Sequence, residues 1–133
     1  MTPKVMVALA LALLTTPALA QQPACTPPLS PMLRIEFYFG RNIAHHAPVS
    51  DRAWKRFVST ELTPRFPGLT VLDAQGAWRA GRRELREASK LVIVVAKDDA
   101  ATRDAVAAAS DAYKRRFHQT SVGIVTQPVC AAF

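Results

Sequence analysis

One short run of the chain alternates apolar residues with side chains that could do chemistry. In the segment RIEFYFGR, residues 34–41, Arg34, Glu36 and Tyr38 alternate with isoleucine and phenylalanine. Side chains alternate across a strand, so this spacing predicts a strand that presents the three polar residues on one face. A carboxylate beside a guanidinium and a phenol could bind a ligand, take part in proton transfer, or form a charge pair on the wet face of a sheet.

Three more ionisable residues follow this predicted strand. Arg41 comes directly after it, and His45 and His46 lie in the loop beyond. Anions bind at this place in phosphate-handling domains with a similar order of elements, but the loop here has one glycine and no glycine-rich cradle. Adjacent histidines on an extended loop point in different directions, and no third ligand stands at a known spacing. We therefore expect no metal site.

Positive charge is concentrated in WRAGRRELREASK, residues 78–90, which holds four arginines and one lysine against two glutamates. Arg82 and Arg83 lie in its turn, and His118 follows in a basic stretch near the end of a predicted helix. The formal net charge of the chain is +7. Such a segment is either an ordinary solvated surface or a site for an anionic small molecule or an anionic surface.

The first 20 residues have the pattern of a secretory signal peptide. One lysine precedes an apolar run over residues 5–14, and Ala18-Leu19-Ala20 forms a small-residue site that predicts cleavage after Ala20. Ten apolar residues are too few to span a bilayer, so we expect no transmembrane segment after processing. The prediction is an exported protein, periplasmic or secreted. Export argues against nucleic acid as its partner.

The chain has two cysteines, Cys25 and Cys130. In an oxidising compartment an even count favours a disulfide, and here one pairing is possible. Neither cysteine has the C-x-x-C spacing of a metal site, and two thiols are too few for an iron–sulfur cluster. A lipid on Cys25 is the alternative, although residue 22 is glutamine where a lipoprotein signal has an aliphatic residue.

The remaining sequence predicts the elements that position these residues. Residues 21–31 form a proline-rich extended lead, and residues 32–133 form a single domain. Within the domain, hydrophobic periodicity and capping residues predict six elements in order. They are a strand at 33–39, a helix at 50–62, a short strand at 69–73 followed by a turn at 73–76 and an irregular ribbon at 77–87 with a second turn at Gly81, a buried strand at 90–96, a helix from 98 or 99 to 118, and a strand at 121–129.

This β-α-β-β-α-β order predicts an α+β ferredoxin-like sandwich, an antiparallel sheet with two helices on one face and strand order four, one, three, two. The last strand would then lie antiparallel beside the first. Its end would meet the start of the first strand, where Cys130 and Cys25 stand, and a disulfide needs Cα atoms within about 7 Å. The loop with Arg41, the arginine-rich turn and His118 would gather at the opposite end of the sheet.

Four stretches resemble the signature of a known family: EFYFGR, TPRFPGLTVLDAQGAWR, REASKLVIVV and YKRRFHQTSVGIVTQPVC. They are similar to small exported bacterial proteins classed as a domain of unknown function, and the resemblance covers about Cys25 to Phe133. No activity is established for that family, so the resemblance implies no catalytic roles. The matching positions are Glu36, Tyr38, Phe39, Gly40, Arg41, Pro64, Phe66, Gly68, Trp78, Glu87, Ser89, Lys90, Gln127 and Cys130.

Together these features predict a binding module for an anionic ligand or partner, without a cofactor. Its contacts would come from the arginine-rich end and from the polar face of the first strand. The alternative is a small cofactor-free enzyme, isomerase-like or oxygenase-like, with its pocket at a sheet-to-sheet homodimer interface. Glu36 would be its base, Tyr38 its proton donor and His118 or His45 the orienting group. A desolvated Glu36 favours the enzyme, and a flat wet face favours the binding module.

Overall fold

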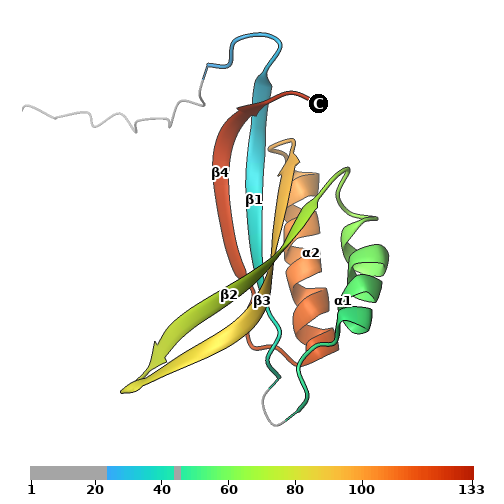
Figure 1. Ribbon diagram of the computed structural model, residues 1–133. Coiled ribbons are helices and arrows are strands. Elements are labelled where there is room, and N and C mark those ends of the chain that lie inside the picture. The colour runs from blue at the N-terminus through green and yellow to red at the C-terminus, as the bar shows by residue number, and fades with distance from the viewer. Residues whose placement is uncertain (1–23, 44–45) are drawn as a thin grey trace, which may run out of the picture.

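The computed structural model of the chain describes residues 24–43 and 46–133 (Figure 1). The predicted signal peptide, most of the lead before Cys25, and His45 lie outside the described residues. The elements, in order, are β1 (Ser30–Gly40), α1 (Asp51–Phe57), the π-helical turn η1 (Val58–Leu62), β2 (Thr70–Ala80), β3 (Arg83–Ala96), α2 (Ala100–Phe117) and β4 (Gly123–Ala131). The first strand thus begins inside the predicted lead of 21–31.

The described strands form one antiparallel sheet in the order β2-β3-β1-β4. This is the predicted ferredoxin-like arrangement, with both helices on the same side of the sheet (Figure 1). β4 lies beside β1 and places Cys130 opposite Pro31. Cys25 and Cys130 form a disulfide with their Cα atoms 5.6 Å apart. The predicted pairing of the two cysteines, and of the first and last strands, is confirmed.

The core lies between the sheet and the helices and is mainly aromatic. Phe37 and Phe39 of β1 are fully buried, and the Phe39 ring lies 5.4 Å from Trp54 of α1 and 4.6 Å from Tyr113 of α2, between ring centroids. Burial of these large side chains is the main stabilising contribution in a domain of this size. Because side chains alternate along β1, Arg34, Glu36 and Tyr38 lie on the side that the helices leave uncovered, as predicted.

The helix predicted over 50–62 is confirmed at its start and wrong in its second half. The Ser50 side chain caps it by accepting a 3.2 Å hydrogen bond from the third residue beyond. From Val58 to Leu62, however, the backbone widens to a π-helical turn. The hydroxyls of Ser59 and Thr60 donate to a carbonyl oxygen one turn back, which competes with the α-helical pattern. No helix in the described residues is long and apolar enough to cross a membrane.

The turn predicted at 73–76 is wrong, because β2 runs through it without interruption to Ala80. The second turn, predicted at Gly81, is confirmed, and the φ of +62° at this residue suits glycine. The ribbon predicted as irregular over 77–87 is instead regularly paired, from Ala77 opposite Arg86 to Ala80 opposite Arg83. The two long strands continue past the end of β1 as a two-stranded ribbon that projects from the body (Figure 1). Asp73 lies where β3 still pairs with β1 and faces Lys90, whereas Gln75 and Gly76 begin the projecting ribbon and are exposed.

Candidate functional site

The open face of the sheet, meaning the side opposite the helices, carries the polar trio Arg34, Glu36 and Tyr38. Nη2 of Arg34 lies 2.8 Å from Oε1 of Glu36, and the Tyr38 hydroxyl donates a 2.6 Å hydrogen bond to Oε2 of Glu36. The hydrogen bond from Tyr38, followed by that from Arg34, lowers the pKa of Glu36, and the same bond raises the pKa of Tyr38. Glu36 is therefore held in its ionised form, which makes it a weak proton acceptor.

Apolar side chains surround this trio on the open face. In the strand register, Glu36 stands between Ile93 of β3 and Val125 of β4, and Tyr38 stands opposite Leu91. Val125 is 51% exposed, and the β3 side chains are half-buried. The open face is thus an apolar surface with an internally neutralised polar centre.

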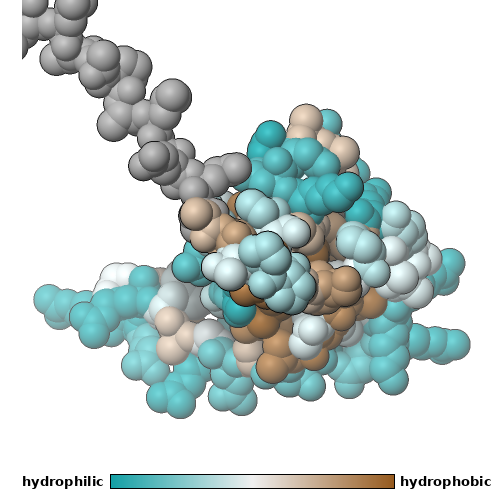
Figure 2. All heavy atoms as spheres, turned by 90° about the horizontal axis from the view of Figure 1, so that it is seen from above, coloured by the Kyte–Doolittle hydropathy of each residue, from teal (hydrophilic) through white to brown (hydrophobic). Residues whose placement is uncertain are grey.

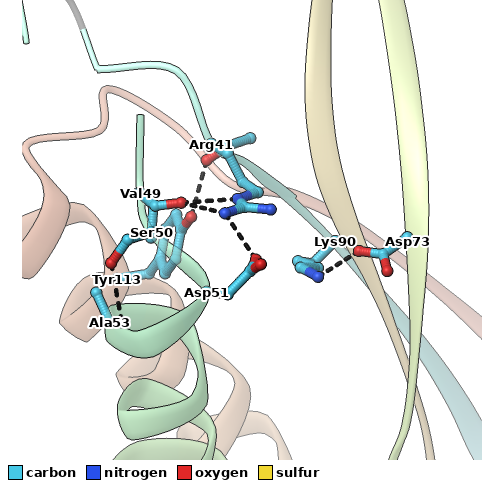
Figure 3. A network of polar contacts seen from close by, with 9 residues as sticks. Arg41, Val49, Ser50, Asp51, Ala53, Asp73, Lys90 and Tyr113 are labelled. Carbon is cyan, nitrogen blue, oxygen red and sulfur yellow. Dashed lines mark hydrogen bonds and ion pairs between the residues drawn. The ribbon is translucent and has the colours of Figure 1, made fainter. Parts of the chain in front are cut away.

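At the end of β1, Arg41 is bound within the chain (Figure 3). Its Nε donates a 2.8 Å hydrogen bond to the carbonyl oxygen of Val49, and its Nη2 lies 2.9 Å from Oδ1 of Asp51. The side chain is only 18% exposed. The carboxylate of Asp51 therefore occupies the place beside the guanidinium where an anion would bind, and Arg41 ties its loop to the start of α1.

Two further polar pairs lie close to Arg41 (Figure 3). The buried Tyr113 donates a 2.8 Å hydrogen bond to the carbonyl oxygen of Gly40, and burial raises the pKa of Tyr113. Lys90, 8% exposed, pairs with Asp73, and this hydrogen bond lowers the pKa of Asp73. Sequence reasoning missed the Lys90 pair because it placed a turn at Asp73; a continuous β2 would have put the two residues in register.

Glu87 of β3 reaches across the end of β1. Its Oε1 accepts a 2.9 Å hydrogen bond from the backbone N–H of Asn42. A Cβ atom at Gly40 would lie 2.5 Å from the same oxygen. Gly40 is therefore needed for this close approach, which holds a carboxylate against the open-face end of β1.

A hollow of about 790 Å³ lies where the open face meets the β2–β3 ribbon and the loop between α2 and β4. Its lining includes Tyr38, Trp78, Leu85, Arg86, Glu87 and His118. His118 ends α2 with a left-handed backbone, φ 52°. The structure thus brings two predicted site residues, Tyr38 and His118, to one hollow. Neither Arg34 nor Arg41 lines it.

The ribbon carries most of the predicted arginine-rich segment. Arg82 and Arg83 lie at its tip, and Arg83 is four residues from Glu87, or roughly 13 Å at the rise of a strand. Arg86 pairs with Glu84 at 2.9 Å, both side chains being exposed. The guanidinium groups of the remaining arginines have no ion-pair partner among the described residues: Arg79, Arg82 and Arg83.

The predicted histidine pair is only half described. The backbone N–H of His46 donates to the carbonyl oxygen of Ile43, and the His46 side chain is exposed; His45 lies outside the described residues. Within 24–43 and 46–133, no three histidine, cysteine or acidic side chains come together as a possible metal site.

A second hollow, of about 710 Å³, lies at the opposite end of the sheet, near the disulfide. Its walls are largely apolar and include Leu69, Ile93, Val95 and Ala101. Figure 2 looks down on this end and shows hydrophobic residues gathered in the middle, with hydrophilic residues to either side. None of the predicted ligand contacts lines this hollow.

Two solved structures share this architecture. A phage SAM lyase in complex with S-methyl-5'-thioadenosine superposes with a TM-score of 0.58 at 14% sequence identity, covering 77% of this chain and 90% of that one. CutA1 from Oryza sativa superposes with a TM-score of 0.52 at 10% identity, covering 79% of this chain and 85% of that one. At these identities the likeness concerns the fold alone.

Among curated proteins, none matches the chain. A family model described as "Protein of unknown function (DUF3574)" matches residues 34–133. The matched range begins at Arg34, the first member of the polar trio. It contains every residue that lines the first hollow, and every residue that lines the second hollow except Met32.

Proposed function

The chain belongs to the DUF3574 family of proteins of unknown function, and we propose that it is an exported module that binds an anionic ligand or partner. The binding site is the β2–β3 ribbon together with the adjoining hollow. The observation that carries this proposal is the set of three exposed guanidinium groups on the ribbon that no carboxylate of the described chain neutralises. Arg34, Arg41 and Arg65 each face a carboxylate within 3 Å. Arg52 and Arg56 of α1 have no ion-pair partner among the described residues, like the ribbon arginines, but they do not adjoin the hollow, and they therefore serve as the control below.

Trp78 and Leu85 extend the site from the arginines toward the hollow. The two residues stand opposite each other on the ribbon and are 54% and 39% exposed. Arg83 follows them on the same face toward the tip, and Glu87 lies on the other side of them, toward the body. Because Glu87 repels anions, the negative group of a ligand would lie at the arginines, with any apolar portion over Trp78 and Leu85.

The enzyme alternative finds less support in the geometry. A general base works best with a pKa near the working pH, whereas the hydrogen bonds from Tyr38 and Arg34 lower the pKa of Glu36. His118 and Tyr38 line the same hollow, but Glu36 does not. The base of the predicted enzyme, Glu36, thus lies outside the hollow that Tyr38 and His118 share.

Export is part of the same proposal. The disulfide between Cys25 and Cys130 is consistent with an oxidising compartment. The first 20 residues have the pattern of a signal peptide, which would direct the chain to export. In such a compartment the anions available to the ribbon are lipid headgroups, acidic polymers and small organic acids rather than nucleic acid.

The experiment measures binding of the oxidised protein to vesicles of phosphatidylglycerol and phosphatidylcholine in equal parts, and to citrate. Each cation near an anionic surface contributes about 1 kcal/mol, so the double variant Arg82→Ala, Arg83→Ala should bind the vesicles roughly 30-fold more weakly. If citrate binding depends on the same pair, the ligand is a small anion. The mature N-terminus is confirmed by mass spectrometry of the exported protein.

The matched control removes the same charge from the other side of the molecule. Arg52 and Arg56 are exposed on α1, and their double alanine variant should bind both probes nearly as well as the unmodified protein. An equal loss in both double variants would show that net charge alone is responsible. That result, or no binding to either probe, would overturn the proposal.

A further inference from the structure

We infer that another copy of this chain covers the open face of the sheet. This inference goes beyond the proposed anion site and does not depend on the arginines of the ribbon. It rests on the composition of the open face, its size, its charge balance and the ribbon that extends it.

The open face is rich in exposed apolar side chains. Leu72, Val125 and Trp78 are 43%, 51% and 54% exposed. They come from β2, from β4 and from the ribbon. Leu72 stands opposite the half-buried Leu91 of β3, Trp78 stands opposite Leu85, and Val125 is separated from the half-buried Ile93 by Glu36 of the polar trio. Soluble monomers rarely leave so much apolar surface on one face in water, and a surface of this extent marks an interaction site.

The size of this face is close to what a stable contact between two proteins buries. Nine residues of β1 pair with β4, and four strands lie side by side. At about 3.3 Å per residue and about 4.8 Å between strands, the face and the ribbon together present roughly 700 Å², against about 800 Å² per partner in a standard interface.

The charges on the open face identify the partner as a copy of the same chain. Arg34 and Glu36 neutralise each other at 2.8 Å, and the Tyr38 hydroxyl is already bonded to Glu36. The centre of the face therefore offers no unpaired charge to an acidic or a basic partner. Apart from Glu87, beside the end of β1, the face is neutral and largely apolar. Such a surface is complementary to itself, which is the requirement for a contact between identical surfaces.

The ribbon supports the same assignment. Past the pair formed by Gly40 and Ser89, β2 and β3 have neither β1 nor a helix beside them. An isolated two-stranded ribbon is marginally stable in water. Trp78 and Leu85 continue the apolar open face along it, so a second copy that lies on this face would also cover the ribbon.

Such a copy would close the hollow lined by Tyr38, Trp78 and His118 from its solvent side. The arginine end of the anion site would then lie at the edge of the contact, with Arg82 and Arg83 projecting beyond it, whereas Trp78 and Leu85 would belong to both. Because Arg82 and Arg83 lie outside the contact, their replacement tests anion binding without altering association.

The test uses two pairs of neighbouring residues that point to opposite sides of the same strand. On β2, Leu72 lies on the open face and Val71 on the helix side, with exposures of 43% and 37%. On β4, Val125 lies on the open face and Ile124 on the helix side, with exposures of 51% and 39%. Each of the four is replaced by arginine, and the molar mass is measured by light scattering after gel filtration over a range of concentrations.

We expect the unmodified protein, Val71→Arg and Ile124→Arg to have a multiple of the monomer mass, and Leu72→Arg and Val125→Arg to have the monomer mass. Circular dichroism and the intact disulfide identify any variant that fails to fold. The double variant Arg82→Ala, Arg83→Ala should keep the mass of the unmodified protein, which separates this inference from the anion site.

A monomeric unmodified protein at micromolar concentration would overturn the inference. So would an assembly that both members of a residue pair disrupt equally, because the contact would then not be specific to the open face. An unmodified protein that is monomeric with a co-purified lipid or small molecule would assign the face to that occupant instead.

Discussion

The Tyr38 hydroxyl and Oε2 of Glu36, two residues apart on the open face of β1, are joined by a 2.6 Å hydrogen bond. This bond is the largest cause of the lowered pKa of Glu36, ahead of the contact with Arg34. The carboxylate that the sequence offered as a base is thus stabilised in its charged form by the residue that was to be its proton donor.

Replacement of Tyr38 by phenylalanine should raise the pKa of Glu36 toward its ordinary value of 4.5. A carboxyl whose pKa is lowered in the folded state stabilises the fold above its unfolded pKa, and this contribution disappears as the pH falls through the folded pKa. The variant should therefore lose less stability than the unmodified protein on acidification below pH 4.5. Carbon-13 NMR of the Glu36 carboxyl measures the pKa directly. A value unchanged in Tyr38→Phe, or one that moves more in Arg34→Met, would contradict the assigned order of causes.

Arg41→Ala should destabilise the fold rather than remove a ligand contact. The change leaves the carbonyl oxygen of Val49 and the carboxylate of Asp51 without their cation. Hydrogen bonds to charged groups contribute about 1.5–3 kcal/mol, and the exposed position of Asp51 puts the expected loss near the lower end. Urea unfolding gives the free energy. Arg52→Ala, an exposed change on α1 next to Asp51, is the control and should have little effect on the free energy of unfolding.

Gly40→Ala should be destabilising because of Glu87 specifically. A methyl group at this position meets Oε1 of Glu87 at 2.5 Å and pushes the carboxylate away from the N–H of Asn42. The flexible end of the glutamate can move, so we expect a cost of about 1 kcal/mol from the lost hydrogen bond. In a Glu87→Ala background the same glycine change should cost clearly less. Equal costs in the two backgrounds, measured by denaturant unfolding, would show that the two residues are not coupled.

Replacement of both cysteines by serine should lower stability strongly. The bridge joins positions 105 residues apart, and closing a loop of that length contributes up to about 4–5 kcal/mol through the entropy of the unfolded chain. Thermal unfolding should show a lower midpoint for the variant, and a reducing agent should lower the midpoint of the unmodified protein only. If the reducing agent leaves the unmodified protein unchanged, the bridge does not contribute to its stability.

Much of the fold could be predicted because its determinants are local or nearly unique. The period-two pattern of β1 separates the buried phenylalanines from the polar trio, and capping residues mark the start of each helix. The β2–β3 ribbon over 77–87 and its turn at Gly81 could also be predicted, but its regular strand pairing could not. Over 73–76, a short, mostly exposed stretch that contains Asp73, Gln75 and Gly76 resembles a turn.

The candidate site shows the same division. Placement of Arg41, Arg82 and His118 at one end of the molecule follows from the order of the elements. Their partners do not: Arg41 is neutralised by Asp51, whereas Arg82 and Arg83 meet no carboxylate of the described chain. The contacts of Glu87 with Gly40 and Asn42 depend on the register of β3 against β1 and were seen only in the structure.

By itself the sequence determined which face of the first strand is buried and which two cysteines a disulfide would join, because side chains alternate along a strand and two cysteines allow one pairing. Only the tertiary structure decided which charges remain available to a ligand. Whether a guanidinium is free or paired depends on the register between strands far apart in the chain, and no local pattern of residues contains that information.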